Sequence, residues 1–185
     1  MALRVLKNLR DSQQVIKFSN LGSIQDCKIV SWADSSYGKS EPGQTVNGVI
    51  TFIQGNNGKM NVLDWTSHKL DVPVASPLAG ECEAALEAYS RIKWMRSLIK
   101  DILGQEEMPA IIRTDSKSLC DSVASSSQVK DKRAMVGIST LRAVPEFDGT
   151  QLEWIPGKEN LADHLTKTTS NAEQLRYVLH EGRAI

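Results

Sequence analysis

The sequence lacks the features that mark several common classes of protein. Its three cysteines, Cys27, Cys82 and Cys120, form no even set and show no Cys-x-x-Cys spacing, so a reducing compartment is favoured over a disulfide scaffold. No apolar run reaches the roughly 18 residues of a membrane span, and no signal peptide is visible. We therefore expect an intracellular, cytoplasmic protein that does not associate with a membrane.

Further absences narrow the chemistry of the chain. The three histidines show no His-x-x-His or His-Glu-x-x-His spacing, so a zinc site is not predicted. No glycine-rich phosphate loop and no Ser-His-Asp arrangement stands out. The 22 basic residues balance the 22 acidic residues, which counts mildly against strong autonomous binding of nucleic acid. A nuclease that gains affinity from a neighbouring domain stays open.

The composition that is present predicts one globular domain. The 185 residues are 41% hydrophobic and 24% charged, which suits a single domain with a sizeable core. Hydrophobic periodicity and turn residues predict an α/β fold with a five-stranded mixed sheet flanked by helices, in the order β-β-β-α-β-α-α-β-α. Strands are expected at 28–34, 46–54, 59–66, 110–114 and 151–155, and helices at 77–103, about 117–122, 129–144, around 161–165 and 170–181. Residues 2–10 are expected to form a short helix, and residues 14–18 a short extended piece.

The predicted helix at 77–103 carries one apolar stripe, and a glutamate lies on it. Glu81 stands one turn before the first alanine of the stripe, whereas Glu83 and Glu87 fall off it and are expected in solvent. The stripe consists of Ala84, Ala85, Ala88, Ile92, Met95, Ile99 and Ile102. The four tryptophans, Trp32, Trp65, Trp94 and Trp154, are expected to be mostly in the core.

Four acids stand in segments that a folded core is expected to bury. They are Asp34, Glu81, Asp115 and Asp163, each at a strand end or a helix start. A buried acid is costly unless it is paired or holds a metal. Carboxylates are hard oxygen ligands that suit Mg²⁺ or Mn²⁺. Two such ions about 4 Å apart can clamp a phosphodiester, so the acids predict metal-dependent chemistry on phosphate.

Each acid taken alone also has a structural interpretation. Asp34 and Asp115 can cap loops or helices, as aspartate often does. Glu81 can pair with a lysine, and Asp163 can be a charge on a helix surface. The neighbouring His164 is expected on the surface. The order and the local contexts of the four acids together favour the metal site.

Several segments resemble the ribonuclease H domain of copia-type (Pseudoviridae-like) LTR retrotransposon Pol polyproteins. SWADSSYG resembles the first-strand motif of that family, and LDWTSHK resembles a later strand. SPLAGECEAALEA with KWMRSLIKDIL is similar to its long helix, and RTDSKSLCDSV to its next acidic motif. VKDKRAMVGISTLR and WIPGKENLADHLTK resemble the later helix and the closing phrase of the family. The resemblance covers about residues 25–170.

The resemblance implies a ribonuclease H that cuts the RNA strand of RNA–DNA hybrids during reverse transcription. Asp34, Glu81, Asp115 and Asp163 fall on the catalytic acids of the family, which bind two Mg²⁺, or Mn²⁺ in their place. Asp34 would bridge both ions, Glu81 and Asp115 would complete one site, and Asp163 the other. The partners implied are the hybrid and the upstream reverse transcriptase of the same polyprotein, inside a virus-like particle. The implied division is 1–24 as a connecting segment, 25–169 as the ribonuclease H domain and 170–185 as a C-terminal helix.

The sequence departs from the family in two places. The loop before the last acid reads PGKEN and lacks the histidine that many relatives carry there. VKDKRAM stands where copia-type relatives have a different basic box. Candidate contacts with nucleic acid are Ser35, Ser36, Ser116, Lys117, Lys130, Lys132, Arg133 and Lys158.

Two other functions share this fold. An integrase or transposase core uses an Asp-Asp-Glu set, which Asp34, Asp115 and Glu159 can mimic. Glu81 and the LADHLTK phrase argue against that function. A non-catalytic module that tethers or binds hybrids is the third alternative, although all four acids are present.

Overall fold

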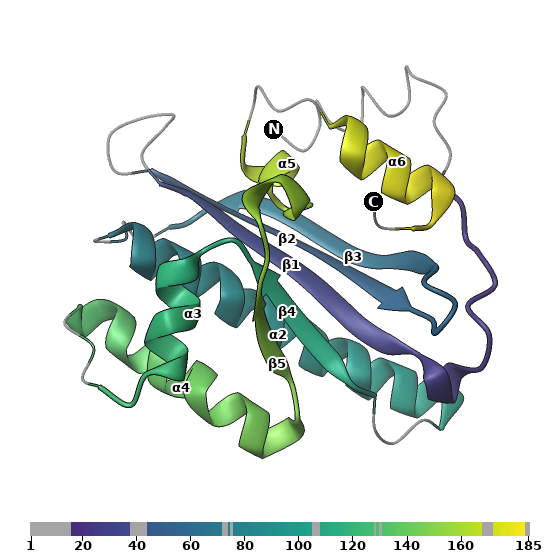
Figure 1. Ribbon diagram of the computed structural model, residues 1–185, viewed down its shortest axis with the longest axis horizontal. Helices are drawn as coiled ribbons and strands as arrows, with labels where there is room; N and C mark the ends of the chain where they lie inside the picture. The colour runs from purple at the N-terminus through teal and green to yellow at the C-terminus, as the bar shows by residue number, and fades with distance from the viewer. Residues whose placement is uncertain are drawn as a thin grey trace.

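The computed structural model describes residues 16–37, 44–71, 74, 76–104, 108–127, 129, 131–167 and 172–183 (Figure 1). The predicted strand at 59–66 runs three residues further, and the first strand continues past Asp34 to Tyr37. The strands are β1 (Lys28–Tyr37), β2 (Thr45–Gln54), β3 (Met60–Lys69), β4 (Ala110–Thr114) and β5 (Gln151–Trp154). The helices are η1 (Ile24–Asp26), α2 (Pro77–Leu103), α3 (Lys117–Ala124), α4 (Lys132–Asp148), η2 (Gly157–Glu159), α5 (Asp163–Thr166) and α6 (Glu173–Glu181).

The five strands form one mixed sheet, as the sequence predicts. Its order is β3-β2-β1-β4-β5, with β1 antiparallel to β2 and parallel to β4. Parallel neighbours need a long crossover connection, and α2 supplies it. The first and fourth strands therefore lie side by side, which brings their carboxyl ends to the same edge of the sheet.

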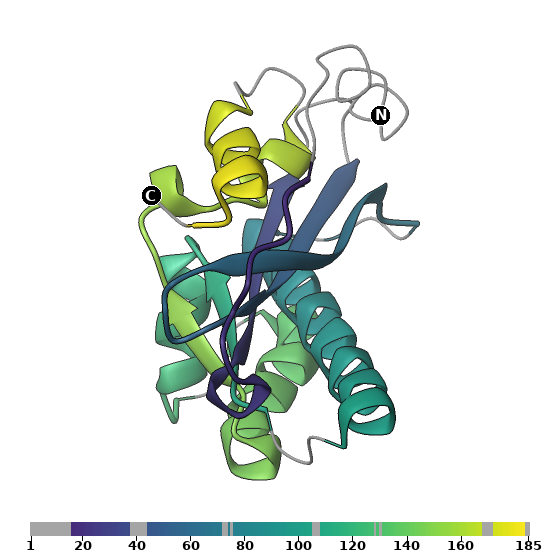
Figure 2. The same ribbon diagram turned by 90° about the vertical axis from the view of Figure 1, so that its right-hand side faces the viewer.

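The two faces of the sheet bury separate hydrophobic cores (Figure 2). Successive side chains of a strand point to opposite faces, so Ile29 and Ala33 of β1 belong to one core, and Val30 and Trp32 to the other. Helices α2, α3 and α4 cover the first face, while α5 and α6 pack on the second. The predicted C-terminal helix is thus a packing element, anchored by Leu175 and Val178.

Helix α2 begins and ends at residues that are typical of helix termini. The Ser76 side chain accepts a hydrogen bond from the Ala79 amide at 3.1 Å, Pro77 occupies the first turn, and Gly104 ends the helix with φ of 66°. Its alanines are fully buried, which lets the helix lie close to the sheet. The predicted stripe is wrong only at Ile102, which is 68% exposed.

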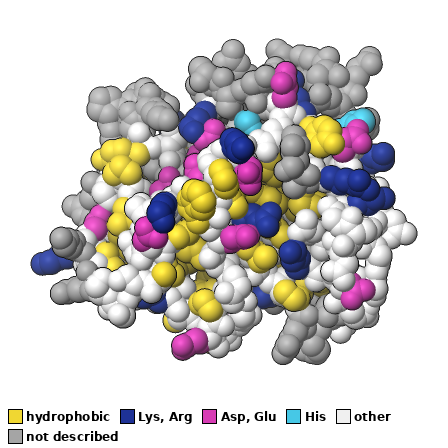
Figure 3. Space-filling model, in the orientation of Figure 1, with side chains coloured by type: hydrophobic (Ala, Val, Ile, Leu, Met, Phe, Trp, Pro, Cys, Tyr) yellow, Lys and Arg dark blue, Asp and Glu magenta, His cyan; other side chains and the backbone are white. Residues whose placement is uncertain are grey.

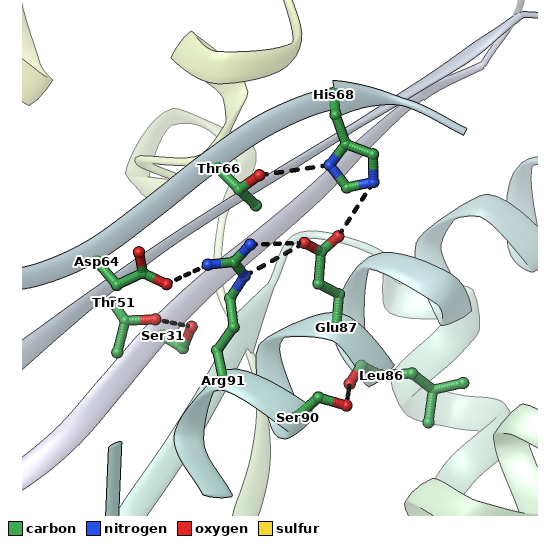
Figure 4. A network of polar contacts seen from close by, with 9 residues as sticks. All are labelled: Ser31, Thr51, Asp64, Thr66, His68, Leu86, Glu87, Ser90 and Arg91. Carbon is green, nitrogen blue, oxygen red and sulfur yellow. Dashed lines mark hydrogen bonds and ion pairs between the residues drawn. The ribbon is translucent and has the colours of Figure 1, made fainter. Parts of the chain in front are cut away.

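Edge strand β3 is joined to α2 by a polar network (Figure 4). Arg91 forms ion pairs with Asp64 of β3 and, at 3.2 Å, with Glu87 one turn earlier on its own helix. Nε2 of His68 lies 3.7 Å from the other oxygen of Glu87. Glu87 is therefore a partner of β3 and not a solvated residue, whereas Glu83 is exposed as predicted.

The described part of the N-terminal region lies against the domain. The Lys17 amide donates to the carbonyl of Leu179 at 3.0 Å, and Ser19 exchanges two hydrogen bonds with the side chain of Asn61. Of the extended piece predicted at 14–18, residues 14 and 15 lie outside the described residues, and residues 16–18 belong to no strand. The predicted helix at 2–10 lies outside the described residues, and the proposed division at residue 24 stays a prediction.

The tryptophans show where core prediction fails. Trp32 is 2% exposed, but Trp65, Trp94 and Trp154 are 50%, 59% and 49% exposed. An indole is large and amphipathic, so sequence position alone does not bury it. Within the described ranges, no helix has both the length and the apolar character to cross a membrane.

Gly48 of β2 lets α5 approach the sheet beside Asp34. A Cβ at this position would lie 2.8 Å from Cγ2 of Thr166 and 2.9 Å from Cβ of Leu165. We predict that Gly48→Ala lowers the free energy of unfolding by about 1–3 kcal/mol through overpacking, and that Gly48→Val lowers it further. Urea denaturation with an unchanged m-value measures this effect. Alanine in a strand is otherwise favoured over glycine, so an unchanged or higher stability would contradict the close approach.

Candidate metal centre

Three of the four predicted acids meet at the carboxyl edge of the parallel strands. Asp34 lies in the C-terminal half of β1, Asp115 follows β4 directly, and Glu81 lies in the second turn of α2. One carboxylate oxygen from each lies within 4.8 Å of the others. We call Asp34, Glu81 and Asp115 the carboxylate cluster.

Glu81 of the carboxylate cluster has a strongly raised pKa. Its burial, followed by the charges of Asp34 and Asp115, raises its pKa from the ordinary 4.5 to about 8. Lys167 and the backbone N–H of Ser35 lower that pKa in part. Oε2 of Glu81 is buried and accepts no hydrogen bond from the described residues, so the enclosed carboxyl lacks a protein donor at that oxygen.

Residues 157–167, here called the closing segment, run from η2 through α5 and supply donors to the carboxylate cluster. Nδ2 of Asn160 donates to Oδ1 of Asp115 at 2.9 Å and to the carbonyl of Ala33 at 3.0 Å. The hydroxyl of Thr166 donates to Oδ2 of Asp34. These contacts join the closing segment to the ends of β1 and β4.

Asp163 stands at the start of α5, where the sequence predicts it, but it is not part of the carboxylate cluster. Its Oδ1 pairs with Nζ of Lys167, one helical turn later. Sequence reasoning did not select Lys167 as a site residue. The i, i+4 spacing of an acid and a lysine on a short helix was the available signal.

The donor set of the carboxylate cluster fits a divalent cation. Three carboxylates that converge without a cation repel one another, and hard oxygen ligands match Mg²⁺ or Mn²⁺. The buried Oε2 of Glu81 is an orphaned acceptor of the kind that such an ion would satisfy. The chemistry of the residues therefore agrees with the predicted cofactor.

Some of the residues predicted to contact nucleic acid are exposed to solvent, and others are buried. Lys117, Lys132 and Lys158 are exposed, and Ser116 caps α3 at its N-terminus. Ser36 is only 7% exposed, and the hydroxyl of Ser35 is buried, so neither hydroxyl is presented on the surface. Lys130 and the side chain of Arg133 lie outside the described residues.

The loop that lacks the family histidine passes beside Asp115. A Cβ at Gly157 would lie 3.0 Å from Oδ2 of Asp115, so a larger residue there would require the Asp115 carboxylate to shift by a few tenths of an ångström. The surface position predicted for His164 is wrong, because both of its ring nitrogens are buried. Burial lowers the pKa of His164.

A cavity of about 250 Å³ lies at β4 and β5, on the sheet face that also carries α5 and α6. Hydrophobic side chains gather in the middle of the molecular face drawn in Figure 3, with charged groups among them. The guanidinium of Arg113 lies 5.2 Å from the centre of the Trp32 ring, and its Nε donates to Glu153 at 2.8 Å. The carboxylate cluster contributes no lining residue, so the cavity is distinct from the metal centre. The lining residues are Trp32, Arg113, Glu153, Trp154, Ile155, Pro156, Glu159, Leu161 and Gln174.

Comparison with known proteins gives relatives for both the sequence and the fold. No protein-family model matches the chain. The Ty1-DR5 Gag-Pol polyprotein of Saccharomyces cerevisiae is 27% identical over 157 residues, which is 84% of this chain and 9% of that polyprotein. LC11 ribonuclease H1, solved in complex with an RNA/DNA hybrid, superposes with a TM-score of 0.55 at 20% identity, over 75% of this chain and 94% of its own. The N-terminal ribonuclease H domain of a Mycobacterium tuberculosis protein gives 0.54 at 18% identity, over 80% and 95%.

The chain has the ribonuclease H fold, and its sequence is similar to part of the Ty1 Gag-Pol polyproteins. The five-stranded mixed sheet and its flanking helices confirm the predicted fold. The chain spans about a tenth of the length of the polyproteins that it matches.

The raised pKa of Glu81 predicts how the stability of this domain depends on pH without metal. Between pH 4.5 and about 8, folded Glu81 keeps a proton that the unfolded chain has lost, so stability falls as pH rises through this window. Glu81→Gln removes this dependence. Relative to wild type, its free energy of unfolding should therefore rise across the window, by on the order of 2–4 kcal/mol above pH 8.

Denaturant unfolding in EDTA at pH 5, 7 and 9 measures this difference. Glu83→Gln is the matched control, because Glu83 is exposed on the same turn of α2. A Glu81→Gln effect that is the same at all three pH values would contradict the raised pKa.

Proposed function

We propose that this domain hydrolyses the RNA strand of RNA–DNA hybrids with the help of two divalent cations. The observation that carries the proposal is the convergence of Asp34, Glu81 and Asp115 within 4.8 Å at the carboxyl edge of a ribonuclease H sheet. Likeness in fold alone does not specify chemistry, but acids at this edge are where α/β sheets place their ligands.

The residues of the chain divide into two proposed metal sites. Glu81 and Asp115 would hold one Mg²⁺ together with Asp34, and Asp163 would join Asp34 at the other. Cations held by these residues would supply activation of the attacking water and stabilisation of the leaving oxygen. The raised pKa of Glu81 means that cation binding must take a proton from this carboxyl near neutral pH.

The proposed contacts with the substrate are made by exposed, positively charged side chains. Lys117 at the start of α3, Lys132 at the start of α4, and Lys158 in η2 are exposed cations available to phosphates. An RNA–DNA hybrid would be distinguished by its 2′-hydroxyls, largely without sequence preference. Because the chain has no net charge, part of its affinity would come from the reverse transcriptase domain of the same polyprotein.

The integrase alternative is not favoured by the geometry. It would need Glu159 beside Asp34 and Asp115, but Glu159 is exposed in η2 and lines the separate cavity with Trp32 and Leu161. Glu81 of α2 takes the third position instead. This arrangement supports hydrolysis of a hybrid over the joining of DNA strands.

Asp34→Asn tests the proposed chemistry directly. The substitution keeps the shape of the side chain and removes the charge shared by both proposed metal sites. We expect cleavage of a labelled RNA–DNA hybrid in Mg²⁺ to fall on the order of 1,000-fold or more, which equals about 4 kcal/mol of transition-state stabilisation. Circular dichroism should show the fold unchanged.

Asp121→Asn is the matched control for this test. The Asp121 side chain on α3 is 65% exposed and forms an ion pair with the solvent-exposed Lys117, so cleavage should stay at the wild-type rate. Wild-type cleavage should stop in EDTA and return with Mn²⁺. Undiminished cleavage by Asp34→Asn would contradict the proposal.

Asp163→Asn separates the two proposed metal sites. Because Asp163 lies outside the carboxylate cluster, its loss should leave the first cation-binding event and weaken the second. Calorimetric titration of the hybrid-free protein with Mn²⁺ distinguishes the two events. Identical titrations for Asp163→Asn and wild type would contradict the assignment of Asp163 to the second metal site.

A further inference from the structure

Two neutral side chains of the closing segment contact the carboxylate cluster from within the core. Asn160 is 1% exposed and Thr166 is 4% exposed. They stand six residues apart, one before α5 and one at its end. Each donates to a different aspartate, Asn160 to Asp115 and Thr166 to Asp34.

The amide of Asn160 is fixed by three hydrogen bonds. Its Nδ2 donates to the carbonyl of Ala33 at 3.0 Å and to Asp115 at 2.9 Å, while its Oδ1 accepts from the Ala162 amide at 3.1 Å. Ala33 directly precedes Asp34. One amide nitrogen therefore ties the backbone next to one cluster aspartate to the carboxylate of the other, which sets the spacing between them.

The hydroxyl of Thr166 orients the second aspartate. Asp34 is 4% exposed, and Thr166 donates to its Oδ2 from the last turn of α5. The methyl group of Thr166 packs where Gly48 of β2 leaves room for it. Packing and hydrogen bonding by this residue are thus performed by different atoms, which makes them separable by substitution.

Neutral donors have an advantage over cations at such a position. A lysine or arginine would also satisfy the carboxylate oxygens, but its charge would compete with a divalent cation for the same acids. An amide or hydroxyl directs a carboxylate and leaves its charge for the metal. Partners that orient the ligands of a metal typically change affinity or activity roughly 10- to 100-fold when they are removed.

We propose that Asn160 and Thr166 are positioning residues that set the spacing and orientation of Asp34 and Asp115 for cation binding. This inference rests on the proposed two-metal function. It assigns to the closing segment a role in the affinity of the first metal site, beyond its contribution of Asp163 to the second.

Thr166→Val and Thr166→Ser form the central test. Valine keeps the methyl packing and loses the hydroxyl, whereas serine keeps the hydroxyl and loses the methyl. Calorimetric titration of the hybrid-free protein with Mn²⁺ should show affinity lowered roughly 10-fold or more in Thr166→Val and held within about twofold of wild type in Thr166→Ser. With saturating hybrid, kcat should fall in the valine variant while KM stays unchanged.

Thr51→Val is the matched control for loss of a buried hydroxyl. Thr51 is fully buried and shares a 2.8 Å hydrogen bond with Ser31 in the same sheet (Figure 4). Its substitution should lower the melting temperature and leave Mn²⁺ affinity at the wild-type value. Asn160→Leu, similar in size but without donors, should weaken Mn²⁺ binding as Thr166→Val does.

The outcomes separate the inference from the function on which it rests. Wild-type affinity in Thr166→Val would overturn the inference while leaving the two-metal function in place. Equal losses in the valine and serine variants would also overturn it, because packing would then be responsible. A wild-type protein that binds no Mn²⁺ and cleaves no hybrid would instead overturn the proposed function, and the inference with it.

Discussion

Mutual repulsion among three enclosed carboxylates is the constraint on which the rest of this structure depends. At separations within 4.8 Å, and away from bulk water, like charges raise the energy of the folded state. Burial of Glu81, followed by the charges of Asp34 and Asp115, raises the pKa of Glu81 to about 8. Hydrophobic burial elsewhere must offset that energy. Two separate cores on the faces of one sheet supply the burial and hold the acids together.

The scaffold meets this constraint by taking the acids from elements that cannot easily move apart. Asp34 and Asp115 come from neighbouring parallel strands, and Glu81 comes from a 27-residue helix with fully buried alanines against the sheet. The closing segment then packs on β1 and β2 across Gly48. A shift of any one element would separate the acids only by disrupting a hydrophobic core.

The sequence predicted these elements well where local patterns decide them. Helix α2 and strand β4 were placed at their observed bounds, because a serine cap, a proline and a terminal glycine delimit one, and a short apolar run the other. Local patterns do not reveal long-range partners. The burial of His164 and the donors from Asn160 and Thr166 depend on how residues after β5 fold back over β1, a contact across more than 120 positions. Exposure of the large indoles is similarly a matter of tertiary geometry, which composition does not encode.

The zero net charge of the chain bears on nucleic-acid binding because three of its acids lie together at one edge of the sheet. A cluster of carboxylates without cations repels the phosphates of a nucleic acid. The exposed lysines of α3, α4 and η2 attract phosphates, but no net positive charge of the chain reinforces that attraction. Bound divalent cations would reverse the local sign at the edge where the strands end. Under the proposed function, cation binding and hybrid binding would therefore assist each other, because each ligand neutralises charge that opposes the other. In the proposed polyprotein context, a tethered neighbour would raise the local concentration of the substrate without a net positive charge on this domain.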